Sequence, residues 1–445
     1  MKIEGAGEMF GYYLDLALRS FKRNRVLTAL MVLALGLGIG ASITTLTVLK
    51  LLSGDPLPQK SARIFAPETD PLPAQAQVLA QKQFSQWGNL MTYTDAMNLL
   101  HAHKAKRQAV VALTGAKIAP REAGRHPFFS NGVMTTADFF AMFNVPFHYG
   151  SGWSEQDGED RARVAVISTT LNDKLFEGKN SVGQMIRVND RDYRVIGVLK
   201  PWAPQPRFYA ISVGGQGYGN GDDVFMPVQS ALADQMAPQL TNCWATGVDY
   251  FHLETAPCGI VSLWVELKHA SDAAAYKTFL SNYVAQQISL GRFHFPEVAL
   301  PDLTAYLVQQ QVVPNDARLQ AYLAFGFLLI CIVNTVGLLL AKCLRRSREI
   351  GVRRALGATR AAVFAQFMVE SGMVGIAGGV LGLIFAELGL WAIRHQPAQY
   401  AKLAHLDPSM FIATFGIALV ASLIAGLLPA WRACVVAPAP QLKSV

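Results

Sequence analysis

Few side chains in this sequence have the type and spacing that catalysis requires. His101 and His103 are two residues apart, and we interpret them as solvated loop side chains rather than metal ligands. The glycine-rich residues 214–221 lack the strand-to-helix context of a phosphate-binding loop, so we interpret them as a flexible loop. The sequence contains no Gly-x-x-x-x-Gly-Lys-Ser/Thr, His-Glu-x-x-His, Cys-x-x-Cys or Gly-x-Ser-x-Gly motif. We therefore expect a non-catalytic protein with no metal site, no cofactor and no P-loop of its own.

The five cysteines fall into two groups. Three of them lie in or beside long apolar segments, whereas Cys243 and Cys258 lie in the long polar part of the chain. Only that pair would meet an oxidising compartment. A disulfide between Cys243 and Cys258 would close a short loop and contribute about 3 kcal/mol. Two separate buried thiols are the alternative.

Basic side chains are densest in residues 341–360, which contain Lys342, Arg345, Arg346, Arg348, Arg353, Arg354 and Arg360. As a helix, this segment has a small apolar face formed by Ile350, Ala355 and Leu356, and Gly357 is a suitable C-terminal stop. A short amphipathic helix of this kind could bind another protein. Attachment to anionic lipid is the alternative.

Four long apolar segments predict transmembrane helices at residues 26–50, 317–341, 362–393 and 409–429. Each is long enough to cross a hydrocarbon core of about 30 Å. Basic residues flank them at 19–25 and 342–361, so the positive-inside rule places these parts in the cytoplasm. The same reasoning predicts an amphipathic cytoplasmic helix at 1–25, a short periplasmic loop at 394–408 and a cytoplasmic tail at 430–445. We expect an inner (plasma) membrane protein with both termini in the cytoplasm.

Composition agrees with a protein that is part membrane and part soluble, because 51% of its residues are hydrophobic and 16% are charged. The net charge of +8 comes largely from residues beside the spans, so it does not call for a nucleic-acid partner. No window in residues 51–316 resembles a span, and we assign this segment to a large extracytoplasmic (periplasmic) domain. The predicted fold class is thus a membrane protein with four transmembrane α-helices and a large α+β domain between helices 1 and 2.

The clearest part of the predicted outer domain is residues 131–199. A buried strand is expected at 163–168, a helix at 169–176 and a hairpin of strands 185–188 and 193–198 across residues 189–192. A helix should start near Phe139, with Asp138 or Thr136 as its cap. We interpret residues 66–111 and 201–312 as a second lobe of the same domain.

Three polar residues in the predicted spans are Asn334, Glu370 and Glu387. Charged groups are costly in a bilayer, and we place the two carboxylates toward opposite ends of the third helix, where the cost is smaller. Asn334 lies deeper and could form an interhelical hydrogen bond, either with a second subunit or within its own bundle. Small-xxx-small spacing predicts close helix packing at Gly36 and Gly40 and at Gly375 and Gly379.

The string of residues 348–358, followed by Gln366, Phe367 and Glu370, resembles the signature of the MacB/FtsX-type ABC transporter permeases. Residues 429–433 resemble the closing motif of that family, and residues 163–198 resemble its periplasmic core domain. The resemblance implies that residues 348–358 form a coupling helix. The residues assigned to ATPase coupling are Arg348, Glu349, Ile350, Gly351, Arg353, Arg354, Leu356 and Gly357, with Ile350 and Leu356 expected to seat the helix.

The resemblance also implies partners. A cytoplasmic ABC ATPase dimer would bind ATP, and a second permease copy or a homologue would complete the membrane assembly. ATP-driven closure would move the first two helices and transmit that motion to the outer domain.

Two outcomes of this motion compete. One is export of a drug, peptide or lipid-linked substrate, with a periplasmic adaptor and an outer-membrane channel. The other is regulation of a cell-wall enzyme or sensor kinase. The large outer domain favours export.

Overall fold

The computed structural model describes residues 4–72, 89–120, 126–215, 217–313, 315–396, 401–406 and 408–435. The chain forms two compact units, one made of Met1–Leu52 and Val313–Val445 and the other of Ser53–Val312. The last ten residues of the predicted tail lie outside the described part of the chain.

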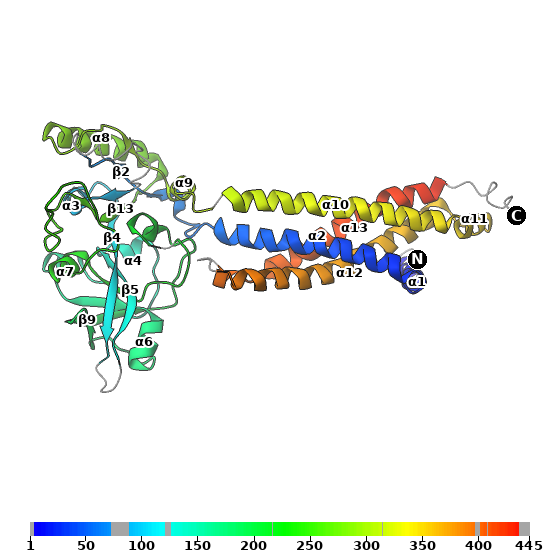
Figure 1. The fold of residues 1–445 in the computed structure, drawn as a ribbon, viewed down its shortest axis with the longest axis horizontal. Helices are drawn as coiled ribbons and strands as arrows, with labels where there is room; N and C mark the ends of the chain where they lie inside the picture. Colours follow the sequence, from blue (N-terminus) through cyan, green and yellow to red (C-terminus); the bar gives the residue numbers. More distant parts are fainter. Residues whose placement is uncertain are drawn as a thin grey trace. The chain divides into compact units, whose positions relative to one another are not determined.

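The first unit is entirely helical (Figure 1). Its helices are α1 (Glu4–Arg23), α2 (Arg25–Leu52), α10 (Asn315–Arg345), α11 (Ser347–Ala355), α12 (Arg360–Arg394) and α13 (Pro408–Val435), with the short 3-10 helix η6 (Ala401–Leu403). Four of these, α2, α10, α12 and α13, are long and apolar enough to cross a membrane. Their apolar length follows from the near absence of charge in each segment, and it confirms the four-helix part of the predicted fold class.

Two helices run beyond the predicted spans. Helix α10 continues to Arg345, so Lys342 and Arg345 are helical residues and not part of a loop. Helix α13 continues through Pro429 to Val435. A proline inside a helix removes one backbone hydrogen bond, and its ring crowds the carbonyl of the preceding turn. Helices in apolar surroundings nevertheless often continue past a proline.

Helix α12 packs against both α2 and α13, and α2 also packs against α10, so that α2 lies between α12 and α10 (Figure 1). The core between these helices is aliphatic and includes Met31, Leu35, Ile39, Val374 and Ala418. The amphipathic helix α1 packs against α12. The bundle therefore holds together through its own side chains, and its remaining apolar surface faces outward.

The second unit is built on a ten-stranded mixed sheet with the order β1-β13-β4-β5-β10-β7-β9-β6, with β3 beside β13 and β8 beside β4 and β9. These strands are β1 (Ile64–Phe65), β3 (Leu90–Met91), β4 (Arg107–Ala119), β5 (Phe128–Thr135), β6 (Phe147–Gly150), β7 (Val164–Ile167), β8 (Met185–Val188), β9 (Arg191–Leu199), β10 (Val224–Pro227) and β13 (Val261–Glu266). The pairs β5/β10 and β7/β9 are parallel, and the other pairs are antiparallel.

Two small sheets pair β2 (Glu68–Thr69) with β14 (Val298–Ala299) and β11 (Asn242–Cys243) with β12 (Cys258–Gly259). The helices of this unit are α3 (Tyr93–His101), α4 (Phe139–Met142), α5 (Glu155–Glu159), α6 (Thr169–Phe176), α7 (Val228–Ala233), α8 (Ala273–Ser289) and α9 (Leu303–Gln309), with 3-10 helices η1 (Ser61–Arg63), η4 (Phe208–Val213) and η5 (Ala270–Asp272). Strands and helices are mixed along the chain, which confirms the α+β class.

Both faces of the large sheet are buried. Successive strand residues point to opposite faces, and in β4 Val110 and Ala112 enter one core while Val111 and Leu113 enter the other. The second core is rich in aromatic rings around Phe139. The sheet runs from β13 and β4 through β5, β7 and β9, so both predicted lobes contribute strands to it.

Local predictions in residues 131–199 are close to the structure. Helix α6 spans Thr169–Phe176, and Ser168 caps it by accepting from the Leu171 backbone nitrogen. The hairpin turn is shorter than expected, because Val188 pairs with Arg191 and only Asn189 and Asp190 remain in the turn. Both have positive φ, which Asn and Asp tolerate.

The predicted cap of the helix at Phe139 is confirmed in position but not in its hydrogen bond. Asp138 occupies the N-cap position of α4 but makes no capping hydrogen bond. Its carboxylate instead accepts from the Gln108 backbone nitrogen at 3.0 Å, and the Thr136 hydroxyl accepts from the Val110 nitrogen at 3.1 Å. Both side chains therefore hold the start of β4 in place.

Candidate functional site

The predicted coupling segment forms the short helix α11. A single residue, Arg346, separates it from the end of α10. Gly357 ends it with φ +101, and the Ala358 and Gly357 nitrogens donate to the Arg353 and Arg354 carbonyls. This is the paired hydrogen-bond pattern of a Schellman motif, for which glycine is the favoured residue. Thr359 then caps α12 by accepting from the Ala362 nitrogen. The segment is therefore a separate helix with defined ends.

One side of α11 is anchored inside the chain. Ile350 is only 6% exposed and packs in a small cluster with Cys343, Val363, Phe367 and Cys434, which come from α10, α12 and α13. Burial of an isoleucine side chain contributes roughly 1.5–3 kcal/mol. Ile350 is therefore not available to a partner in this structure, although the sequence assigned it to seating the helix on an ATPase.

Polar contacts hold the same side of α11. Arg353 pairs with Glu349 at 2.9 Å, one helical turn earlier, and also donates to the Gln366 side chain at 3.3 Å. Arg354 donates to the Cys434 carbonyl at 3.2 Å. The two arginines thus contact α12 and α13. The side chain of Arg348 lies outside the described part of the structure.

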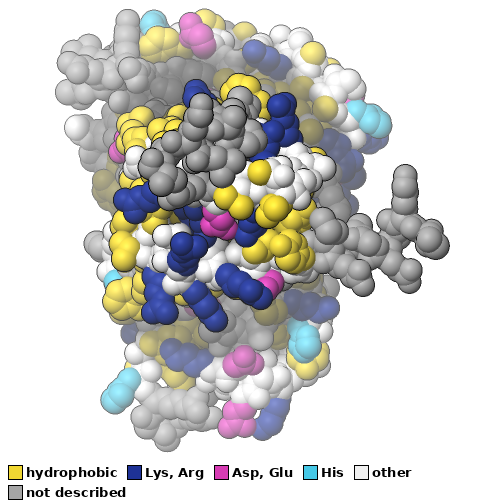
Figure 2. Space-filling view, turned by 90° about the vertical axis from the view of Figure 1, so that its right-hand side faces the viewer, with side chains coloured by type: hydrophobic (Ala, Val, Ile, Leu, Met, Phe, Trp, Pro, Cys, Tyr) yellow, Lys and Arg dark blue, Asp and Glu magenta, His cyan; other side chains and the backbone are white. Residues whose placement is uncertain are grey.

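The other side of α11 is exposed and partly apolar. Leu356 is 83% exposed and Val352 43% exposed. Lys and Arg side chains gather on this end of the helical unit, as Figure 2 shows, and the exposed ones are Arg19, Lys22, Arg23, Arg25, Arg345, Arg360 and Arg432. A small apolar spot surrounded by cations suits a partner surface that is apolar at its centre and acidic around it.

A buried ionic cluster lies under α11. Glu370 of α12, which is 1% exposed, pairs with Lys342 of α10 and accepts a hydrogen bond from Ser20 of α1. Arg346, the residue between α10 and α11, lies 3.7 Å from the other carboxylate oxygen. The Lys342 ammonium also lies 5.3 Å from the centre of the Phe21 ring. Glu370 therefore joins α1, α10 and the start of α11.

This cluster was missed from the sequence. Glu370 was placed near a helix end at low cost, but it is fully buried, and its burial is tolerated because Lys342 and Arg346 lie one turn apart on the facing chain. The sequence signal for this cluster is the pair of cations spaced i, i+4, together with a carboxylate inside an apolar helix. Glu387 differs, because it is half exposed and pairs with Arg394 at 2.5 Å.

The predicted small residues are used for packing within the chain. A Cβ at Gly36 would meet Leu381, and one at Gly40 would lie 2.6 Å from the Phe385 Cβ, so both allow α2 to approach α12. A Cβ at Gly375 or Gly379 would meet Ser422 or Ala418 of α13. These glycines are therefore occupied by helix contacts inside one subunit.

Asn334 lies on the exposed side of α10, and no hydrogen bond from its side chain is found in the described part of the chain. The structure therefore does not support the alternative in which the Asn334 side chain forms a hydrogen bond within its own bundle. In the second unit, Cys243 and Cys258 form a disulfide that joins β11 to β12. Across the described ranges no group of three or more potential metal ligands occurs.

Comparison with known proteins gives two family matches. Residues 28–282 match the MacB-like periplasmic core domain, and residues 321–438 match the FtsX-like permease C-terminal domain. A macrolide export ATP-binding/permease protein MacB of Bdellovibrio bacteriovorus is 26% identical over 303 residues, covering 66% of this chain and 41% of that protein. A pyoverdine export ATP-binding/permease protein PvdT of Pseudomonas savastanoi is 26% identical over 313 residues, covering 69% of this chain and 42% of its own length.

The chain thus spans less than half the length of these curated relatives, and the matches cover only their permease part. Among solved structures, the periplasmic region of MacB from Actinobacillus actinomycetemcomitans is 14% identical with a TM-score of 0.36, covering 57% of this chain and 94% of that one. The two family matches together extend over most of the chain, including most of each long apolar helix and most of the α+β unit between the first two. The chain belongs to the MacB/FtsX-type ABC transporter permeases, multi-pass membrane proteins with a large extracytoplasmic domain.

Proposed function

We propose that this permease couples ATP hydrolysis by an ATPase on another polypeptide to motion of its outer domain, and that this motion drives export. The names of the relatives support export, because they describe macrolide and pyoverdine exporters. No P-loop motif occurs in the 445 residues, so ATP would bind to the partner ATPase dimer.

The observation that carries the proposal is the two-sided character of α11. Ile350 anchors the helix inside the chain, while Leu356 presents an apolar side chain to the outside. Leu356 and Val352 form an exposed apolar spot within a basic surface, which a bound partner would bury. We assign this surface to the cytoplasmic side, because the basic residues of α1 and α11 gather there.

The buried cluster around Glu370 supports a route for the motion. Arg346 immediately precedes α11, and Glu370 links it to Lys342 of α10 and Ser20 of α1. A displacement of α11 would be opposed by these contacts unless α1 and α10 moved with it. The second transmembrane helix would then carry the movement toward the outer domain.

A second copy of this chain or a homologue would complete the membrane assembly. Asn334 on the exposed side of α10 could bond across such an interface, where a polar group in lipid gains from a partner. A periplasmic adaptor and an outer-membrane channel would complete the export path.

The first experiment is a pull-down of the tagged, detergent-solubilised protein, with identification of the bound proteins and an ATPase assay. Recovery of an ABC ATPase supports the permease assignment, and a membrane-fusion adaptor in the same fraction supports export. Recovery of an ATPase with a cell-wall hydrolase or a sensor kinase would replace export by regulation, the second candidate, for which the FtsX-like match is the reason.

The docking surface is tested by Leu356→Asp. We expect this change to reduce ATPase recovery at least tenfold, because a charge replaces the central apolar contact. Leu290→Asp is the matched control, since Leu290 is 64% exposed in the other unit and should leave recovery unchanged. Equal recovery with both variants would contradict the role of α11. Arg353→Glu with Arg354→Glu is a less direct test, because both arginines also position α11.

A further inference from the structure

A cavity lies at one edge of the large sheet in the second unit. Strands β4 and β13 pair in antiparallel register with Arg107 opposite Glu266, which are the first residue of β4 and the last of β13. The turn before β4 and the turn after β13 must therefore lie side by side. Together with α8, they line an open cavity of about 380 Å³. Small-molecule pockets typically have volumes of roughly 300–1,000 Å³.

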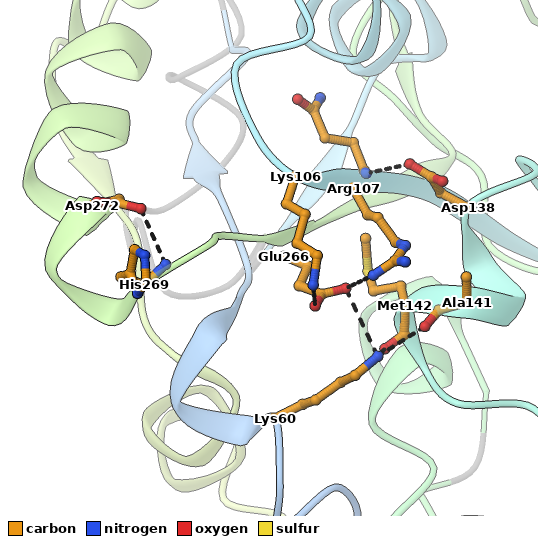
Figure 3. A network of polar contacts seen from close by, with 10 residues as sticks. Lys60, Lys106, Arg107, Asp138, Ala141, Met142, Glu266, His269 and Asp272 are labelled. Carbon is orange, nitrogen blue, oxygen red and sulfur yellow. Dashed lines mark hydrogen bonds and ion pairs between the residues drawn. The ribbon is translucent and has the colours of Figure 1, made fainter.

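Three lysines and a histidine lie in the wall of this cavity. His103, Lys104, Lys106 and Lys268 line it from the two turns. Asp272 is the one acidic residue in the lining, and its carboxylate already accepts from the His269 backbone nitrogen at 3.1 Å (Figure 3).

A neighbouring buried carboxylate does not neutralise this charge. Glu266 is fully buried, and three cations converge on it, as Figure 3 shows: Lys106 at 3.0 Å, Arg107 at 2.9 Å and Lys60 at 3.8 Å. One carboxylate among three cations leaves a positive excess beside the cavity. Within the described ranges no ion pair joins Lys104 or Lys268 to an acid. Both ammonium groups are therefore free to meet an anion.

The opposite wall is aromatic. Tyr276 and Phe279 of α8 line the cavity, with their ring centres 5.5 Å apart. Phe279 is partly exposed, whereas Tyr276 is only 3% exposed and its hydroxyl is buried inside the protein. These rings give the cavity an apolar side that solvated surface lysines alone would not provide.

We propose that this cavity binds a small organic anion, a carboxylate or phosphate ester that carries an aromatic or other apolar group. Lys104 and Lys268 contact the anionic group, and the apolar group lies against Tyr276 and Phe279. The two halves of the cavity wall match the two halves of such a ligand, and neither a simple inorganic anion nor a neutral apolar compound satisfies both. The site does not depend on ATPase coupling.

The test is isothermal titration of the purified full-length protein in detergent with 1-naphthyl phosphate, using empty micelles as the blank. Inorganic phosphate and 1-naphthol are titrated in parallel as the two halves of the probe. We expect 1-naphthyl phosphate to bind once per chain and at least tenfold more tightly than either half. Lys104→Gln with Lys268→Gln should weaken binding about tenfold or more.

Lys179→Gln with Lys200→Gln is the matched control, because it removes two exposed charges from the same unit outside the cavity. All variants are first compared by thermal melting, so that a folding defect is recognised. Unchanged affinity in the Lys104/Lys268 variant would overturn the proposal, as would equal weakening in the control. Equal binding of inorganic phosphate and 1-naphthyl phosphate would also overturn it, because the aromatic wall would then contribute nothing.

Discussion

Glu370 is a buried carboxylate that connects α1, α10 and the start of α11 at one end of the helical unit. A carboxylate without partners in apolar surroundings would cost several kcal/mol, and here Lys342, Arg346 and Ser20 surround it. The ion pair is not evidence of high stability in itself, since a well-packed apolar pair can be equally stable. Its consequence is that each member requires the other.

Glu370→Gln should therefore destabilise the protein by about 3–5 kcal/mol, the typical cost of leaving a buried charge without its partner. Thermal melting of the purified protein in detergent measures the change. Glu387→Gln is the control, because Glu387 is half exposed in its pair with Arg394 and should change stability by less than about 1 kcal/mol. Adding Lys342→Met to Glu370→Gln should recover much of the loss, and no recovery would show that the pair is not the cause.

At the scale of elements, the helical unit depends on close contact between α2 and α12. Gly36 and Gly40 on α2 face Leu381 and Phe385 on α12, and Gly382 of α12 in turn faces Ile39. Glycine lets the two backbones approach closely. Close packing is important in a bilayer, because lipid chains are as apolar as the helix side chains and the hydrophobic effect does not drive the helices together. α12 also contacts α13 through Gly375 and Gly379, so it has little freedom to move aside.

Gly40→Ala should destabilise the helical unit by about 1–3 kcal/mol, because its new Cβ would lie 2.6 Å from the Phe385 Cβ. Gly416→Ala on α13 is the matched control, since a Cβ there meets nothing within 4 Å. It should be neutral or stabilising by up to about 1 kcal/mol from helix propensity. A similar melting temperature for both variants would disprove the close contact between α2 and α12.

At the scale of the whole molecule, each unit has its own core and its own dependence on solution conditions. Burial would raise the pKa of Glu266, but hydrogen bonds from Lys106 and Arg107 outweigh it and hold the pKa below the usual range of a glutamate. Burial likewise opposes the lowered pKa of Asp234, where hydrogen bonds from Arg163 and Tyr193 prevail. Both carboxylates are in the second unit.

A carboxyl whose pKa is lower in the folded than in the unfolded state stabilises the fold above the unfolded pKa. That contribution is lost as the pH falls through the folded value. Burial raises the pKa of Glu68 and of Asp70, which contribute with the opposite sign, so a variant isolates one group better than a pH titration alone.

Glu266→Gln should lower the melting temperature of the second unit at pH 7, and its difference from the unmodified protein should shrink below about pH 4. Tryptophan fluorescence follows this unit through residues that include Trp153, Trp202, Trp244 and Trp264, whereas Trp391 and Trp431 report the helical unit. Glu159→Gln, at an exposed carboxylate, should leave the melting temperature unchanged at both pH values. A difference for Glu266→Gln that is independent of pH would show that Glu266 does not titrate differently in the two states.

Much of the architecture could be predicted from the sequence because it depends on local patterns. Uninterrupted apolar length determines the four long helices, and alternation with turn residues determines the strand, helix and hairpin of residues 163–199. The family could also be recognised, since the string at 348–358 is contiguous. Within α11, the position of the last helical residue followed from Gly357, because a glycine accepts positive φ wherever it stands.

Only the tertiary structure decided which residues meet across the chain. Ile350 of α11 and its C-cap residue Leu356 are both apolar, yet one is buried and the other exposed, because α12 and α13 cover only one side. Glu370 and Lys342 are 28 positions apart, and the residue spacing within either segment does not indicate that they form an ion pair. The cavity beside β4 and β13 arises in the same way, since a long-range strand register brings its two cationic turns together. The periodicity of the sequence indicates which side of a helix or strand is apolar, whereas tertiary packing determines which residues that side contacts.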